Sequence, residues 1–594
     1  MTSAPPTTFP THEEFDRQHE IIVREEIEIF RQKAEAFLAG EIPEDEFRSF
    51  RLKHGIYGQR QPGFQMVRCK IPGGLLTSQQ AEQFARIADE FGGGRGHLST
   101  RQNMQYHFVP LARVPSLMHL LADVGLTNRE ACYNTVRNVT ACPWSGLARD
   151  EVFDVRPYAQ RLAYAFLRKD LTGNLPRKFK IAFDGCAGQD CIVSAINDIG
   201  LRAVVRDGRR GFRMVIGGGL GPLPTEAQLL DEFVPEERLL NRCEAVIRVF
   251  NQWGNRSNKN KARMKFVLRE RGIAWLQEHI DKEYADILAN GGIAWPDRVP
   301  EGFGGYQSKP LPLGDGALLP VLNAGRTDDP QYDAWLDTNV KHQKQTGYAA
   351  VTVRVDQGNL TGVQLRGLAR ISSTAGDGLV RVAIQQNLLL AFIPLGRLPR
   401  VYAALRELGL AAPSAGRIED VVTCPGSYTC NLGLTKTMNL GAALADTVRA
   451  YDDPQVNRLS IKASGCPNAC GHHWIADLGF YGNARKIGGK EVPYYQMLLG
   501  GGYDEQGLMR FGLAVQSIPA RLAPEAVTRV LDHFISNRQP GESFRQYVMR
   551  HKVETFRELT SDLAKPAELF PEIYQDWGDD EAFSLQLGRG ECAA

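Results

Sequence analysis

The sequence predicts an α+β protein with a three-domain body, built from duplicated half-domains that are related by pseudo-twofold symmetry. Three observations lead to this prediction: an internal repeat, a strand-like alternation that changes to a helical period within each copy, and a length of 594 residues. A chain of this length exceeds the size of one hydrophobic core, so we expect several packed units. A binding site is expected where the two halves meet.

The repeat is visible when the chain is compared with itself. One copy runs from Val67 to Leu126 and the other from Val353 to Leu410, and Asn103 to Gly125 has the same spacing as Asn387 to Gly409. A similar turn follows each copy, RNVTACP in the first half and EDVVTCP in the second. In each copy, apolar and polar residues first alternate as in a strand and then recur at helical spacing. A second strand pattern and a second helical pattern follow.

The elements follow from these patterns in chain order. Near the start, apolar residues recur at close to helical spacing and Gly40 ends the pattern, which predicts an amphipathic helix. Those apolar residues are Ile21, Ile22, Ile27, Ile29 and Phe30. The predicted units are a helical arm at 1–55, a half-domain at 56–130, a mixed α/β unit at 131–290, a Gly/Pro-rich linker at 291–345, the second half-domain at 346–412, a second mixed unit at 413–570 and a tail at 571–594.

Composition limits the classes of partner and compartment. The formal net charge of +2 gives no reason to expect nucleic acid or a membrane surface as a partner. No secretory signal is recognisable, and no run of about 18 uncharged apolar residues would serve as a membrane helix. We therefore expect a cytoplasmic protein.

The cysteines carry the strongest chemical signal. Eleven cysteines in a chain without a signal peptide favour thiolate or metal chemistry over disulfides. Cys424-x5-Cys430 and Cys466-x3-Cys470 form two close pairs in TCPGSYTCN and SGCPNACGHHW, which suits either an iron–sulfur cluster or zinc. Zinc more often uses shorter spacings, and the prolines and glycines favour open loops, so a cluster is the preferred interpretation. The other cysteines, at 69, 132, 142, 186, 191, 243 and 592, are taken as non-ligands, including the pair Cys186-x4-Cys191.

The first half is rich in fixed cations beside turn glycines. Lys178 and Lys180 fall on one face of a predicted strand while Phe179 points the other way. Two ammonium groups on one face are costly unless an anion or solvent lies there. Solvated surface charge is the alternative for any single residue. The other members of this set are Arg68, Lys70, Arg101 and Arg137.

Together, the cysteine pattern, the segments LSTRQNMQ and LPRKFK and the duplicated half-domains resemble the sirohaem-dependent sulfite and nitrite reductases, over about residues 50 to 570. The resemblance implies a central site with a [4Fe–4S] cluster on Cys424, Cys430, Cys466 and Cys470. It also implies that Cys470 bridges to the sirohaem iron. The unit at 131–290 would bind sirohaem and substrate, and the unit at 413–570 would bind the cluster and sirohaem.

The same resemblance assigns roles to the polar residues. It implies that Arg68, Arg137, Lys178 and Lys180 bind the oxyanion, where arginine offers forked donors and lysine can also relay protons. Sirohaem carries many carboxylates, and family members often have arginine where His97 stands, which puts a contact there in doubt. The residues expected to contact sirohaem are His97, Ser99, Thr100, Arg101, Asn103, Gln105, Asn258, Lys259 and Cys470.

Tyr57 and Cys132 match positions that are joined by a covalent side-chain link in some sulfite reductases of this type. The alternative is a packed phenol and a buried thiol.

By this resemblance the protein is expected to reduce sulfite to sulfide in assimilatory sulfur metabolism; the alternative is a ferredoxin-dependent nitrite reductase that forms ammonia with the same cofactors. Lys180 favours sulfite, because related nitrite reductases have asparagine there and a second lysine suits a doubly charged anion. No flavin module is recognisable, so ferredoxin or a separate flavoprotein reductase should supply electrons. A zinc-bearing binding module without catalytic activity is the alternative from another class.

Overall fold

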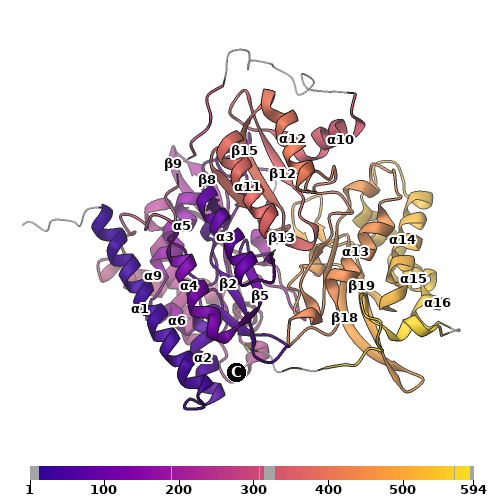
Figure 1. The fold of residues 1–594 in the computed structure, drawn as a ribbon, viewed down its shortest axis with the longest axis horizontal. Helices are drawn as coiled ribbons and strands as arrows, with labels where there is room; N and C mark the ends of the chain where they lie inside the picture. The colour runs from indigo at the N-terminus through magenta and orange to yellow at the C-terminus, as the bar shows by residue number, and fades with distance from the viewer. Residues whose placement is uncertain are drawn as a thin grey trace, which may run out of the picture.

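The computed structural model describes residues 12–188, 190–306, 308–313, 328–566, 569–586, 588 and 591. The fold mixes helices and sheets, with the N-terminal part of the chain on the left of Figure 1 and the C-terminal part on the right. Part of the linker predicted at 291–345 and of the tail predicted at 571–594 lies outside the described residues, as does Cys592. No described helix is both long and apolar enough to cross a bilayer.

Two helices, α1 (His12–Leu38) and α2 (Glu44–Lys53), precede the first half-domain. Helix α1 packs on α4 through a buried stripe that advances by four, three and four residues. The stripe consists of Val23, Ile27, Phe30 and Ala34. The predicted helix is present, and its residues Ile21, Ile22 and Ile29 lie off the stripe and are 45% to 50% exposed. Gly40, with φ of 79°, follows the end of α1 as predicted.

The two half-domains contain the same order of elements. This confirms the predicted duplication. The first contains β1 (Ile56–Gly58), β2 (Phe64–Cys69), β3 (Leu75–Thr77), α3 (Ser78–Glu90), β4 (Arg95–Leu98), β5 (Met104–Pro110) and α4 (Val114–Ala122). The second contains α10 (Pro330–Asn339), β11 (Val340–His342), β12 (Tyr348–Val353), β13 (Asn359–Thr361), α11 (Gly362–Ala375), β14 (Leu379–Val382), β15 (Leu388–Pro394) and α12 (Leu398–Glu407).

Equivalent helices begin in the same way in both halves. Thr77 caps α3 and Thr361 caps α11, and each threonine forms a capping box with the glutamine three residues later. The same glutamines then reach the end of the following helix, since Gln80 Nε2 donates to Val124 O at 3.0 Å and Gln364 Nε2 donates to Leu408 O at 3.1 Å. The local sequence therefore determines both the start of each helix and part of its packing.

The half-domains exchange a strand with one another. Strand β13 of the second half pairs with β4, and β3 of the first half pairs with β14. The resulting sheets have the orders β1-β2-β5-β4-β13 and β11-β12-β15-β14-β3. Neither sheet is complete without a strand from the other half.

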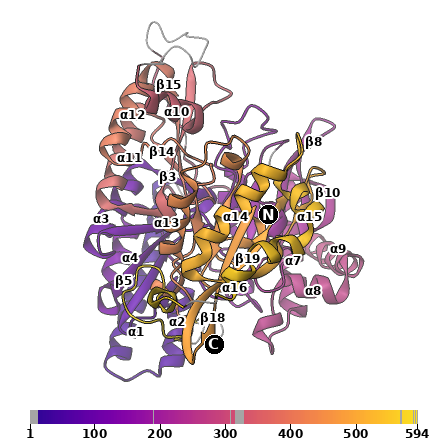
Figure 2. The ribbon, with the colours of Figure 1, turned by 90° about the vertical axis from the view of Figure 1, so that its right-hand side faces the viewer.

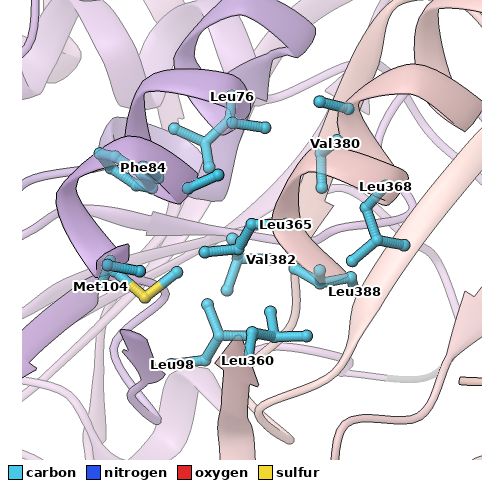
Figure 3. Close-up of a cluster of buried hydrophobic side chains, with 14 of the residues drawn as sticks. Leu76, Phe84, Leu98, Met104, Leu360, Leu365, Leu368, Val380, Val382 and Leu388 are labelled. Atoms are coloured by element: carbon cyan, nitrogen blue, oxygen red, sulfur yellow. The ribbon is translucent and has the colours of Figure 1, made fainter. Parts of the chain in front are cut away.

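One hydrophobic core extends across both half-domains, as Figure 3 shows. Leu76, Phe84 and Met104 come from the first half, whereas Leu360, Leu365 and Val382 come from the second. Helices α3 and α11 pack against each other. The exchanged strands and this shared core hold the two halves as one body.

The two mixed units also repeat a common topology. The first contains β6 (Thr140–Ala141), α5 (Arg156–Ala165), α6 (Asp170–Gly173), β7 (Ile181–Asp184), β8 (Ile199–Arg206), β9 (Arg209–Ile216), β10 (Gln228–Pro235), α7 (Leu239–Trp253), α8 (Met264–Arg271) and α9 (Ile273–Ala289). The second contains β16 (Val422–Thr423), α13 (Thr437–Val448), β17 (Ile461–Ser464), β18 (Leu478–Ile487), β19 (Lys490–Leu499), β20 (Gly502–Tyr503), β21 (Met509–Arg510), β22 (Leu513–Pro519), α14 (Ala523–Asn537), α15 (Phe544–Leu559) and α16 (Ser561–Ala564).

In each mixed unit the first three strands are parallel and the next two are antiparallel. The sheet orders are β6-β7-β8-β9-β10 and β16-β17-β18-β19-β22. Each sheet has its own buried core with its helices, and Figure 2 shows α14 and α15 beside β19. Loops at the carboxyl ends of adjacent parallel strands meet at one edge, which is where sites form in such sheets.

Candidate active site

The four cysteines of the two close pairs converge at one edge of the second mixed unit. Cys424 directly follows β16, and Cys466 comes two residues after β17. Burial, followed by the neighbouring Cys470, raises the pKa of the Cys424 thiol to about 12. Burial and then the other three cysteines raise the pKa of Cys466. Since thiolates are the ligand form, a cation bound among these sulfurs would offset their mutual repulsion.

The surrounding loops fit an iron–sulfur cluster. The amide of Gly465 donates to Cys424 Sγ at 3.3 Å, and amide hydrogen bonds to sulfur are characteristic of cluster sites. A Cβ at Gly465 would lie 2.6 Å from the Cα of Gly426, so only glycine allows these backbones to approach. Cys430 and Cys470 are exposed to solvent. Burial nevertheless raises the pKa of Cys430, so its thiol is accessible yet surrounded by protein atoms.

The turn between β4 and β5 connects the first half-domain to this cysteine cluster. Thr100 Oγ1 donates to the carbonyl oxygen of Cys470 at 2.8 Å. Within the turn, Ser99 Oγ donates to Asn103 Oδ1 at 2.6 Å and accepts from the amide of Arg101 at 3.1 Å. These bonds hold the predicted STRQN segment against the C-terminal unit.

Gln102 is a buried residue of this turn that the sequence analysis missed. Its Nε2 donates to Val382 O at 2.6 Å and to Ala141 O at 2.8 Å, and its φ is 51°. One side chain therefore fastens the turn to the second half-domain and to the first mixed unit. Its position between Arg101 and Asn103 in the STRQN segment could have identified it from the sequence.

Arg101 is half-buried, and its Nε is fully buried. Its guanidinium donates to Asn197 Oδ1 at 2.8 Å and to Asn138 O at 2.6 Å, and burial lowers its pKa to about 9. Its Nε, like that of Arg68, is buried and makes no hydrogen bond to any described residue. Buried guanidinium N–H groups without acceptors fit a site that receives carboxylates or an anion.

His97 and Gln105 lie opposite each other on β4 and β5. The ring of His97 contacts Asn359 Oδ1 at 3.2 Å through Nδ1 and Gln386 Nε2 at 3.4 Å through Nε2. Burial lowers the pKa of His97 to about 4, so the ring is neutral at physiological pH. Both ring nitrogens already contact side chains of the second half-domain.

Lys178 and Lys180 gather with several other cations. The intervening Phe179 is buried in the core of the first mixed unit, so the two lysines share the opposite side of the chain. Burial lowers the pKa of Lys178 to about 8; among the charged neighbours, Cys470 raises it and Arg137 lowers it. Burial, and then Arg101 and Arg263, lower the pKa of Lys180 strongly. Neither ammonium group forms an ion pair or hydrogen bond with a residue that the structure describes.

Arg68 and Arg137 surround Tyr57 and Cys132. Arg68 Nη1 lies 3.6 Å from Cys132 Sγ, and its Cζ lies 5.4 Å from the ring centre of Tyr57. Arg137 Nη2 donates to Tyr57 Oη at 3.3 Å. The fold therefore brings all four predicted residues into one cluster, and a covalent Tyr57–Cys132 link stays a prediction.

Asn258 and Lys259 are less buried than most of the other residues expected to contact sirohaem. Asn258 is exposed and caps a short 3-10 helix by accepting from the amide of Asn260 at 3.0 Å.

Arg263, a few residues further along the chain, is buried at the site and was not predicted from the sequence. Its Nη2 donates to Asp198 Oδ2 at 2.9 Å, and the same oxygen accepts from the backbone amide of Lys180 at 2.9 Å. Asp198 thus positions two cationic residues at the site.

Comparison with protein families gives matches over most of the chain. The nitrite/sulfite reductase ferredoxin-like half domain matches residues 57–124 and 341–408. The nitrite and sulphite reductase 4Fe-4S domain matches residues 132–288 and 414–567. Both families therefore match twice, in agreement with the repeated sheets.

The similar proteins include both nitrite reductases and sulfite reductases. The chain is 31% identical to an assimilatory ferredoxin-dependent nitrite reductase of Haloferax mediterranei, with 89% of each chain covered. It is 28% identical to a ferredoxin sulfite reductase of Mycobacterium tuberculosis, covering 85% of this chain and 88% of the other. The solved structure of the Mycobacterium tuberculosis NirA protein matches with a TM-score of 0.74 and 26% identity, covering 91% of this chain and 97% of that one. The duplicated fold, the four cysteines and these matches establish that the chain belongs to the nitrite and sulfite reductase family of oxidoreductases.

Proposed function

We propose that this oxidoreductase reduces sulfite to sulfide, with ferredoxin as the electron donor. Enzymes of this family carry sirohaem and a [4Fe–4S] cluster, and the matched domain is described by its 4Fe-4S content. When bound, the two groups supply electrons and a metal centre for the oxyanion. The rest of the chemistry depends on side chains of this chain.

The proposal assigns each group of residues a task. Cys424, Cys430, Cys466 and Cys470 would hold the cluster, with Cys470 shared with sirohaem. The residues that would contact the carboxylates and edge of sirohaem are His97, Ser99, Thr100, Arg101, Asn103, Gln105, Asn258 and Lys259. Arg101 has the strongest support, because its buried Nε makes no hydrogen bond within the described residues.

The placement of Lys178 and Lys180 on one side of the chain is the observation that supports the choice of sulfite, because a bound dianion would keep both lysines charged. Both lysines belong to a cluster with Arg101, Arg137 and Arg263, and Asp198 is the acidic residue that offsets this charge. So many cations in a low-dielectric site favour a doubly charged anion over a singly charged one. Arg68 and Arg137 would offer forked donors to the oxyanion oxygens.

Lys178 is suited to proton delivery. Burial lowers its pKa to about 8, which leaves it charged at neutral pH but more acidic than an ordinary lysine. Removing oxygen from sulfite as water consumes protons, and an acid with a pKa near the working pH transfers them most efficiently. Lys178 would therefore both hold the anion and donate to the departing oxygen.

Nitrite reduction to ammonia is the second candidate, and one observation favours it. The relatives that are 31% identical, from Haloferax mediterranei and Synechococcus elongatus, are named nitrite reductases, whereas the 28% relative is named a sulfite reductase. A difference of this size in identity does not separate two substrates within one family.

The proposal of ferredoxin as the electron donor rests on these relatives, which are named as ferredoxin-dependent enzymes. A separate flavoprotein reductase is the alternative.

The test is the turnover of sulfite and nitrite by the purified holoenzyme with a reduced viologen donor. We expect a higher kcat/KM for sulfite, and we expect Lys180→Asn to lower the sulfite-to-nitrite ratio at least tenfold by removing one cation. Lys261→Asn is the matched control, because Lys261 is an exposed lysine between Lys259 and Arg263 but outside the lysine pair. A wild-type preference for nitrite, or an unchanged ratio in Lys180→Asn, would contradict the proposal.

A further inference from the structure

Three cysteines outside the candidate active site bring their sulfur atoms together. The sulfurs of Cys142, Cys186 and Cys191 all lie within 4.8 Å of one another. In the part of the chain that the structure describes, no other group of three His, Cys, Asp or Glu side chains meets this limit. In the sequence no second close pair accompanies Cys186 and Cys191, which predicts that they are not ligands; the fold, however, brings Cys142 to them from the loop after β6.

The position of this trio repeats that of the cluster cysteines. Ala141 of β6 pairs with Phe183 of β7, so Cys142 follows the last pair by one residue and Cys186 follows it by three. In the second unit Thr423 of β16 pairs with Ala463 of β17. Cys424 and Cys466 then follow by the same one and three residues.

Two differences distinguish the trio from the cluster cysteines. Cys191 follows Cys186 by five residues, whereas Cys470 follows Cys466 by four. The equivalent of Cys430, six residues after Cys142, is Ala148, so the fourth thiol is missing. The site therefore lies at the position equivalent to the cluster site and has three cysteines in place of four, with the third displaced by one residue.

The separation of the sulfurs fits a single ion. Zinc binds thiolates at about 2.3 Å, so two sulfurs in a tetrahedral zinc site lie about 3.8 Å apart. Sulfurs that bind different irons of a cluster must stand further apart than this. The sulfurs of Cys424, Cys430, Cys466 and Cys470 do not form such a compact group among the described residues.

We propose that Cys142, Cys186 and Cys191 bind one zinc ion in a structural site. Three thiolates leave the fourth tetrahedral position for a water molecule or another small ligand. Soft thiolate ligands favour zinc over the hard cations magnesium and calcium. The bound ion would tie the loop after β7 to the loop after β6.

Two acidic side chains lie beside the three cysteines. Asp184 is buried beside the trio, and its Oδ2 lies 3.3 Å from Arg202 Nε. Asp190 lies one residue before Cys191 and accepts from Tyr503 Oη at 2.5 Å. The three thiols would lose their protons on binding a divalent ion, and the ion would then offset the negative charge of the thiolates.

Cys186, Ala187 and Asp190, which lie at or next to two of the ligands, make further contacts. Arg202 donates to the carbonyl oxygens of Cys186 at 3.1 Å and Ala187 at 2.9 Å. At the other end, Asp190 accepts from the amides of Ile192 at 3.2 Å and Ser194 at 2.8 Å. The ligands are therefore positioned before the metal binds, and exposed Ala187 and half-buried Cys191 give it a route from solvent.

The experiment measures zinc and iron per chain in the full-length holoprotein, expressed with zinc chloride in the medium and purified without chelator. We expect about one zinc per chain, and a zinc-edge X-ray absorption spectrum with three sulfur neighbours at about 2.3 Å. Cys142→Ala and Cys186→Ala should lose the zinc and keep the iron content and visible spectrum. Cys243→Ala is the control, because Cys243 is buried on α7 and should not affect the zinc content.

Several outcomes would overturn the proposal. These are a wild-type protein without zinc, zinc with oxygen and nitrogen neighbours only, copper or additional iron in place of zinc, or zinc that survives both substitutions. The absorption spectrum needs only the wild-type protein, so the test remains decisive even when a cysteine variant does not fold. The result is independent of whether sulfite or nitrite is the substrate.

Discussion

Thr100 Oγ1 donates a hydrogen bond of 2.8 Å to the carbonyl oxygen of Cys470. The bond joins the turn after β4 in the first half-domain to the loop that carries the last of the four cluster cysteines. The residues expected to contact sirohaem and those expected to hold the cluster are thus fixed to each other directly. Their relative position does not depend on domain packing alone.

Thr100→Val should weaken this connection. The substitution keeps the shape of the side chain but removes the hydrogen bond to the partly buried carbonyl oxygen of Cys470, which costs about 0.5–1.5 kcal/mol. We expect a lower thermal midpoint and faster loss of visible absorption when the holoenzyme is diluted. The control is Thr447→Val, which removes a bond to Ala443 O within α13. Equal effects of the two substitutions would contradict a special role for Thr100.

Cys470→Ser should disrupt the cofactor site. Cys470 raises the pKa of Cys424 and is the residue expected to be shared by the cluster and sirohaem. We expect a lower iron content and a visible spectrum in which the two groups no longer interact. Cys243→Ala, far from the site, should keep both. An unchanged spectrum in Cys470→Ser would refute the assignment of this ligand.

Arg137→Ala should impair turnover without loss of cofactor. The guanidinium lies beside Tyr57 and lowers the pKa of Lys178. A hydrogen bond to a charged partner contributes about 1.5–3 kcal/mol, which corresponds to a decrease in kcat/KM of roughly 10- to 100-fold. Arg213→Ala serves as control, because the side chain of Arg213 on β9 is 42% exposed and pairs with Glu232. Kinetics like those of the wild type would exclude Arg137 from anion binding.

The pH dependence should report Lys178. Because its pKa is lowered to about 8, the ammonium loses its charge as the pH rises through that value, and kcat/KM should fall on the alkaline side. Nitrite is the suitable substrate, since its charge does not change in this range. Lys178→Arg should move the alkaline limb upward, because arginine stays charged. An alkaline limb at the same pH in this variant would assign it to another group.

Local features of the sequence predicted much of the fold. The repeat from Val67 and again from Val353 appears as two half-domains with the same order of elements, and both capping boxes are visible in the sequence as a threonine and a glutamine three residues apart. Such features depend on neighbours within one turn of helix or along one strand. The pattern was less reliable on α1, where Ile21, Ile22 and Ile29 are exposed, because the contact with α4 selects which apolar side is buried.

The candidate site was predicted where spacing and composition carry the signal. The pairs Cys424/Cys430 and Cys466/Cys470 meet, as their spacing and the resemblance implied. Arg263 and Gln102 were missed, since an isolated arginine or glutamine has no distinctive pattern until its neighbours in space are known. Asp198 links Arg263 to Lys180 across 65 and 18 residues of sequence.

By itself the sequence determined the duplication, the cysteine pairs and the basic character of the first half. Only the tertiary structure decided that β3 and β13 are exchanged between the half-domains and that Cys142 joins Cys186 and Cys191. The physical reason is that periodicity and spacing record contacts with near neighbours along the chain. Strand pairing and the meeting of distant loops depend on the packing of the whole core.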